Sequence, residues 1–211
     1  MTKVAPSILS GDFAKMGESV SNAESWGADY IHCDVMDGVY VPNITFGMPM
    51  IKALRPYSSL TFDVHLMITE PEKYVEQFCD AGADIVTFHP EASKDVDKAI
   101  DLIKNKGKKV GLVLNPDKHI ELLLPYLKKI DMIVIMGVYP GFGGQRFIPD
   151  VLGKAKVLKR VGFKGEIELD GGVTEENAAK IVADGVDVLV GGSSVFRSSD
   201  PASTIRRLKG Q

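Results

Sequence analysis

Short runs of apolar residues alternate with amphipathic stretches along the whole chain. The runs are rich in Val, Ile and Leu and nearly continuous, which is typical of strands buried on both faces of a parallel sheet. Eight strands are predicted, at residues 4–9, 30–37, 61–67, 84–89, 109–114, 132–138, 166–171 and 188–196. Helical patterns long enough to connect parallel strands lie between them, including residues 13–26, 72–81, 92–105 and 177–183.

A glycine stands at three of the predicted helix-to-strand joints, at Gly27, Gly82 and Gly185. Glycine can take the left-handed conformation that ends a helix, so these joints indicate one repeated strand–helix unit. Eight units in 211 residues average about 26 residues each, close to the lower size limit of a (β/α)8 barrel. A doubly wound open sheet would use fewer strands and place a glycine-rich phosphate loop after the first strand, which this chain lacks. We therefore predict an α/β fold, a single (β/α)8 TIM barrel domain over residues 1–211.

Composition excludes several classes of partner. Hydrophobic residues make up 45% of the chain and charged residues 25%, and a formal net charge of -3 gives no reason to bind nucleic acid or an anionic membrane. The apolar runs are too short to span a bilayer, and the first residues lack the apolar segment of a signal peptide. With only Cys33 and Cys79, no disulfide framework is expected. We expect a cytoplasmic protein, and a homo-oligomer that associates through its outer helices.

Polar residues near the carboxyl ends of three predicted strands are candidates for a metal site, because barrel active sites lie at those ends. His32 and Asp34 share one face of their strand, and His65 and Asp170 end two others. Two nitrogen and two oxygen donors suit one divalent cation such as Zn, Fe, Mn or Co better than Mg or Ca.

Each of these polar residues taken alone is more often a hydrogen-bonded core group than a ligand. We assign Glu166 and Glu168 to a hydrogen-bonded barrel interior or to a surface pair, and Asp63, which lies deeper than His65, to a structural role. Met36, Met67 and Met136, each taken alone, are likewise expected to pack in the hydrophobic core.

Three glycine clusters follow the last three strands and predict an anion site. They comprise Gly141, Gly143 and Gly144 around Phe142, then Gly171 and Gly172, and then Gly191 and Gly192 before Ser193. One cluster alone would be a tight turn, but glycines on adjacent late strands favour a phosphate site in a barrel. Arg146 is a candidate phosphate partner or a surface charge, His89 could line the pocket, and His119 is expected in solvent.

The chain resembles the ribulose-phosphate 3-epimerase family at these same segments. The matching stretches are APSILS at 5–10, HCDVMDG at 32–38, VPN at 41–43, DVHLM at 63–67, PGFGGQ at 140–145, DGG at 170–172 and GS at 192–193. They follow one another in family order over nearly the whole chain.

The resemblance implies a barrel of the ribulose-phosphate-binding type that holds one divalent metal through His32, Asp34, His65 and Asp170. It implies Asp34 and Asp170 as the acid/base pair, Ser7 and His65 near the substrate, and Met36, Met67 and Met136 around the reacting carbons. The glycine clusters, with Phe142 and Ser193, would hold the phosphate of a ketose phosphate. The reaction implied is the interconversion of D-ribulose 5-phosphate and D-xylulose 5-phosphate through an enediolate.

Two departures leave the length of the substrate open. Residues 137–139 are Gly-Val-Tyr where the family usually has Thr-Val-Asn, and His89-Pro90-Glu91 resembles the allulose-6-phosphate 3-epimerases. A sugar-phosphate lyase on the same barrel would be expected to use a lysine near a strand end, and the predicted strand ends carry none. A phosphosugar-binding protein without activity would not need two carboxylates across its pocket.

Overall fold

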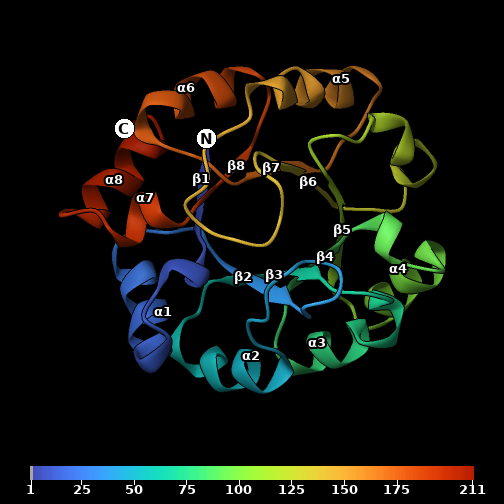
Figure 1. Ribbon diagram of the computed structural model, residues 1–211, viewed down its shortest axis with the longest axis horizontal. Coiled ribbons are helices and arrows are strands. Elements are labelled where there is room, and N and C mark those ends of the chain that lie inside the picture. The colour runs from blue at the N-terminus through green and yellow to red at the C-terminus, as the bar shows by residue number, and fades with distance from the viewer. Residues whose placement is uncertain (1) are drawn as a thin grey trace.

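Eight parallel strands form one sheet that curls into a barrel. The computed structural model describes residues 2–211, and the strands are β1 (Lys3–Pro6), β2 (Tyr30–Met36), β3 (Thr61–Met67), β4 (Ile85–Phe88), β5 (Lys109–Leu114), β6 (Met132–Met136), β7 (Glu166–Asp170) and β8 (Val188–Gly191). Their order is β1-β8-β7-β6-β5-β4-β3-β2, and a parallel bridge between Ser7 and His32 joins β1 to β2. The ring of strands confirms the predicted (β/α)8 barrel (Figure 1).

Helices surround the strands on the outside (Figure 1). They are α1 (Met16–Ser25), α2 (Met48–Leu54), α3 (Val75–Ala81), α4 (Val96–Asn105), α5 (Lys154–Arg160), α6 (Glu175–Ala183), α7 (Ser193–Phe196) and α8 (Pro201–Leu208). The connection from β5 to β6 departs from the pattern, with two 3-10 turns in place of an α-helix (Ile120–Leu122 and Leu124–Tyr126). Within residues 2–211, no helix combines the length and the apolar content needed to cross a bilayer.

Alternation along each strand separates the barrel interior from the layer beneath the helices. On β2, Cys33 and Val35 belong to the large apolar cluster that includes the buried helix faces. Met36 belongs instead to a small cluster with Met67 and Val41 at the mouth of the barrel. The two-residue period therefore directs His32, Asp34 and Met36 inward, as predicted.

The glycine joints also have the predicted conformation. Gly27, Gly82 and Gly185 have φ angles of 89°, 119° and 101°. These left-handed residues end their helices and turn the chain toward the next strand.

The first and last strands are shorter than predicted. The prediction extended β1 to residue 9, but Ile8–Ser10 form a 3-10 turn that begins at Ser7, whose hydroxyl accepts from the Leu9 amide at 3.3 Å. The prediction extended β8 to residue 196, but the strand ends at Gly191 and Ser193–Phe196 are helical. Periodicity could not separate these turns from strands because Ile8 and Val195 are fully buried, like strand residues.

The amino-terminal ends of the strands are joined by a polar network. Lys3 donates to the Tyr30 hydroxyl at 2.6 Å and to Glu166 at 2.5 Å, and Tyr30 donates to Glu166 at 2.8 Å. Burial and the hydrogen bond to Glu166 raise the pKa of Tyr30 to about 12. Glu166 therefore belongs to this network, at the opposite end of β7 from Asp170.

Candidate active site

A cavity of about 650 Å³ opens at the carboxyl ends of the strands. The residues that were predicted from the sequence to form the site and that line this cavity are Ser7, Asp34, Met36, Met67, Met136, Gly141, Phe142, Gly143, Gly144, Asp170, Gly171, Gly172, Gly192 and Ser193. The predicted metal ligands His32 and His65 lie beneath its floor and are fully buried, and Gly191, at the end of β8, does not line it.

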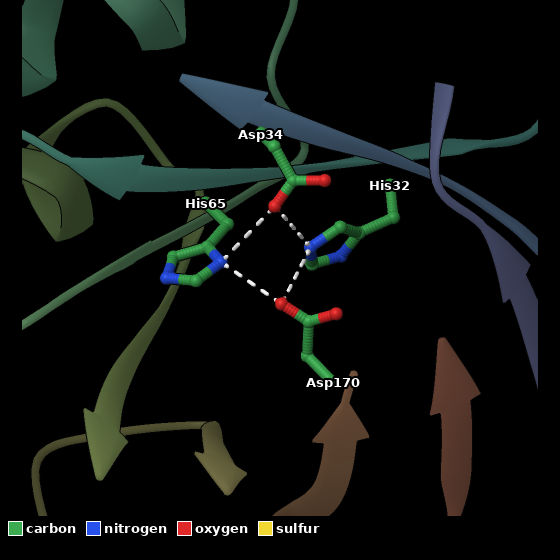
Figure 2. Close-up of side chains that lie close together, drawn as sticks. All are labelled: His32, Asp34, His65 and Asp170. Atoms are coloured by element: carbon green, nitrogen blue, oxygen red, sulfur yellow. Dashed lines mark ion pairs between the residues drawn. The ribbon is translucent and has the colours of Figure 1, made fainter. Parts of the chain in front are cut away.

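Two histidines and two aspartates from β2, β3 and β7 converge at the bottom of this cavity (Figure 2). His32 Nε2 lies 3.3 Å from Asp34 Oδ1 and 3.6 Å from Asp170 Oδ2. His65 Nδ1 lies 3.5 Å and 3.4 Å from the same two oxygens. The four donor atoms thus form a ring in which nitrogen and oxygen alternate.

The spacing of these donors fits one divalent cation. Bonds of about 2.0–2.2 Å to nitrogen and oxygen place neighbouring donors about 3.0–3.6 Å apart, and all four observed separations lie between 3.3 and 3.6 Å. His32 Nε2 and His65 Nδ1 are buried and have no hydrogen-bond partner within residues 2–211. Buried nitrogens of this kind are costly unless a further group satisfies them, and a cation at the centre of the ring would do so.

Each aspartate directs one oxygen into the ring and the other away from it (Figure 2). The outer oxygen of Asp34, Oδ2, accepts a hydrogen bond from the Ser7 hydroxyl at 2.5 Å. Ser7 lies directly after β1, so closure of the barrel between β1 and β2 brings it to this carboxylate. Asp34 and Asp170 both line the cavity, so the oxygens directed away from the ring can face a molecule bound there.

The histidines and aspartates of the ring shift one another's pKa values. Burial alone would raise the pKa of Asp34, but His32 and His65 beside it hold that pKa well below its usual range. Burial lowers the pKa of His32, and the carboxylates around it, first Asp34 and then Asp63, raise it well above the ordinary value. Metal binding needs the free lone pair of each ring nitrogen, so a cation and a proton would compete for the same histidine nitrogens.

The second nitrogen of each histidine meets a different partner. His32 Nδ1 lies 2.7 Å from Asp63 Oδ2, and His65 Nε2 lies 3.0 Å from His89 Nε2. His89 is fully buried and does not line the cavity, contrary to the sequence-based suggestion, because it stands behind His65. Burial, and then the neighbouring His65, lower the pKa of His89 well below its ordinary value. His119 is exposed, as predicted.

Three methionines form an apolar wall above the ring. Met36, Met67 and Met136 are at most 4% exposed, and all three line the cavity. Polarizable, flexible side chains of this kind exclude water while adapting to a ligand. They enclose the space that the outer carboxylate oxygens face.

The glycine clusters lie together at the other end of the cavity, around two serine hydroxyls. A methyl group at Gly192 would lie 2.8 Å from Ser10 Oγ, and one at Gly144 would lie 4.0 Å from Ser193 Oγ. Gly172 has a φ of 70°, and a side chain there would lie 2.6 Å from the Phe147 backbone. Only glycine lets the backbone pass this closely, and it leaves amide groups accessible to an anion.

Several residues in or beside the cavity had no individual role assigned from the sequence, and the candidate Arg146 lines it. Ser10 and Arg197 line it together with Arg146, and the Arg197 amide donates to the Ser193 carbonyl at 3.1 Å. Asn43 donates to the Gly141 carbonyl at 2.8 Å and so ties the loop after β2 to the loop after β6. Residues in loops and turns give no periodic pattern, so their position in the fold had to identify them.

Solved structures of other barrels share this fold. KGPDC from Streptococcus mutans is similar with a TM-score of 0.78 and 15% identity, covering 100% of this chain and 96% of that one. The 3-hexulose-6-phosphate synthase of Salmonella typhimurium has a TM-score of 0.75 and 19% identity, covering 99% and 97%. Fold and site together define a (β/α)8 barrel with a candidate divalent-metal centre.

Sequence comparison identifies the family. The profile of the ribulose-phosphate 3 epimerase family matches residues 3–196. The ribulose-phosphate 3-epimerase of Bacillus subtilis (strain 168) is 46% identical over 215 residues, which cover 100% of this chain and 99% of the relative. That of Synechocystis sp. is 47% identical over 208 residues, covering 96% and 90%. The chain belongs to the ribulose-phosphate 3-epimerase family.

Proposed function

We propose that the protein is a metal-dependent 3-epimerase that interconverts D-ribulose 5-phosphate and D-xylulose 5-phosphate. The observation that carries the proposal is the pair of buried aspartates, Asp34 and Asp170, on opposite sides of a donor ring at the floor of a cavity. Family membership supports the same reaction and does not favour the allulose-phosphate alternative.

Two-base proton transfer explains why two carboxylates are needed. Epimerisation removes the proton on C3 and returns one to the opposite face, and one base on each face does this without turning the intermediate over. Asp34 and Asp170 come from β2 and β7, and each has an outer oxygen directed away from the ring (Figure 2). We assign these oxygens to accept and donate the C3 proton.

The donor ring fits a cation held by His32, Asp34, His65 and Asp170. A bound divalent metal, which we propose to be Zn, Fe, Mn or Co, would act as a Lewis acid toward the charge that develops on the oxygens of the enediolate. The protein itself orients Asp34 through Ser7, keeps His65 in place through His89, and excludes water with its methionines.

The phosphate is assigned to the glycine end of the cavity. Gly143, Gly144 and Gly192, with the hydroxyls of Ser10 and Ser193, would surround it and hold C3 between the aspartates. No lysine is among the described residues that line the cavity, which disfavours a Schiff-base lyase on the same barrel.

The eight strands form one sheet, which supports a single domain over the chain. Cys33 and Cys79 are buried free thiols, which supports a reducing, cytoplasmic location.

Solvent deuterium exchange at C3 tests the function directly. The protein is incubated in deuterated water with ribulose 5-phosphate or allulose 6-phosphate, with and without a chelator, and the C3 proton is followed by NMR. We expect exchange with ribulose 5-phosphate that stops on chelation and returns when a divalent metal is added. Absence of exchange with both substrates would overturn the epimerase proposal, and faster exchange with allulose 6-phosphate would change its substrate.

A further inference from the structure

A second buried polar layer lies beneath the donor ring, on the side away from the cavity. It consists of Asp63 on β3 and Glu168 on β7, both fully buried, and both face the Nδ1 atom of His32. His32 thus stands between two layers, with Nε2 toward the ring and Nδ1 toward these carboxyl groups. Neither residue lines the cavity, so neither can touch the substrate.

The two carboxyl groups are not equivalent partners for His32. Asp63 Oδ2 lies 2.7 Å from Nδ1, a short hydrogen bond, whereas Glu168 Oε1 lies 3.4 Å from it. Asp63 is also paired with His32 in the register of β2 and β3, so the two strands hold its carboxylate beside the ring. Both oxygens of Glu168 have no hydrogen-bond partner within the described chain.

We propose that Asp63 is a positioning residue that fixes the tautomer and the orientation of His32 for metal binding. A carboxylate is an acceptor only, so the hydrogen bond requires the proton on Nδ1 and leaves the Nε2 lone pair for the ring. A histidine that donates to a carboxylate is also a more basic ligand. The inference rests on the metal centre of the proposed function and adds the group that prepares one of its ligands.

His65 offers an internal contrast. Its second nitrogen meets His89 Nε2 at 3.0 Å, and no carboxylate takes part in that contact. Both ligands are oriented by a buried partner, but only His32 is oriented by an anion. His32 should therefore be the ligand whose metal affinity depends most on its partner.

Zinc binding to matched variants tests this assignment. Asp63→Asn converts the carboxyl group next to His32 to an amide, and Glu168→Gln converts the more distant carboxyl group of the same buried layer to an amide. Zinc affinity is measured by competition with a chromophoric chelator, on metal-free protein whose folding is checked by circular dichroism. We expect the Kd for zinc to rise about 10–100-fold in Asp63→Asn and to stay at the wild-type value in Glu168→Gln.

A second measurement needs no variant. The chain has four histidines, so nitrogen-15 NMR of the zinc-loaded wild type can assign the His32 ring, which we expect to carry its proton on Nδ1. Equal zinc affinities of the two variants would overturn the role of Asp63 alone. A His32 proton on Nε2 in the zinc-loaded protein would contradict both that role and the placement of His32 Nε2 in the donor ring. Failure of the wild type to bind zinc or another divalent metal would instead refute the metal centre, and with it the proposed function.

Discussion

Replacement of Asp170 by asparagine separates the role of a base from that of a ligand. Asp170 Oδ2 lies 3.6 Å from His32 Nε2 and 3.4 Å from His65 Nδ1, and its other oxygen is directed away from the ring (Figure 2). Asparagine keeps the shape and an oxygen that can face the ring, but it cannot accept the C3 proton. Loss of a general base costs about 10²–10⁴ in rate, or about 3–5 kcal/mol of transition-state stabilisation.

The assay measures kcat for ribulose 5-phosphate at saturating metal, with the bound metal determined in the same samples. Glu176→Gln is the matched control, because it converts a carboxylate to an amide within the same cavity but away from the ring. A fully loaded Asp170→Asn protein that keeps more than about one tenth of the wild-type kcat would refute the assignment of Asp170 as a base.

Deuterium exchange makes the test more specific. A variant with a single base can still exchange the C3 proton of the epimer whose proton faces that base. We therefore expect Asp34→Asn and Asp170→Asn to exchange opposite epimers, one ribulose 5-phosphate and the other xylulose 5-phosphate. A shared preference for the same epimer would show that the two aspartates do not act from opposite faces.

Three further predictions concern the supporting structure. Gly137→Ala should lower stability by about 2–3 kcal/mol, or about 5–10 °C in Tm, because its methyl group would lie 2.2 Å from the Gly171 carbonyl oxygen in the loop after β7. Gly47→Ala is the control, because its methyl group would lie 4.0 Å from Pro49 Cδ, an ordinary contact distance; equal Tm values of the two variants would contradict the clash. Arg197 lines the cavity, and Arg197→Ala should raise KM for ribulose 5-phosphate about tenfold at low salt with little change in kcat. The reason is that a charge-assisted contact to phosphate is worth about 1.5 kcal/mol or more. An unchanged KM would place Arg197 away from the phosphate. In the folded protein the pKa of Tyr30 is raised to about 12, whereas in the unfolded chain it is about 10. The stabilisation that the neutral Tyr30 hydroxyl provides is therefore complete below about pH 10 and is lost as the pH rises toward 12. Urea midpoints of wild type and Tyr30→Phe should converge over that range, and a constant difference would argue against the shift.

Much of the site could be predicted because it depends on patterns within single strands. The two-residue period of β2 directs His32 and Asp34 to one face, whatever the rest of the chain does. The carboxyl ends of parallel strands meet at one end of a barrel, so His65 and Asp170 could be assigned to the same site before any distance was known. The glycines after the last strands were informative for the same local reason, since their backbone freedom is a property of the residue itself.

The contact between Asp63 and His32 could not be predicted from the pattern within a single strand. The strand of Asp63 places it inward, and the prediction of a structural role was all that its position on β3 allowed. The short contact with His32 arises from the register between β2 and β3, and that register follows from packing around the whole ring.

The sequence by itself determined the repeated strand–helix unit, the inward faces and the chemical character of the cavity, because these depend on residues close together in the chain. Tertiary structure decided where β1 and β8 end, because buried turn residues such as Ile8 and Val195 have the same apolar character as strand residues. It also decided the spacing of the donor ring, since closure at Ser7 and His32 sets how far β2 lies from β7 across the barrel. A separation of 3.3–3.6 Å between donors on three strands is a property of the closed barrel, and no local pattern encodes it.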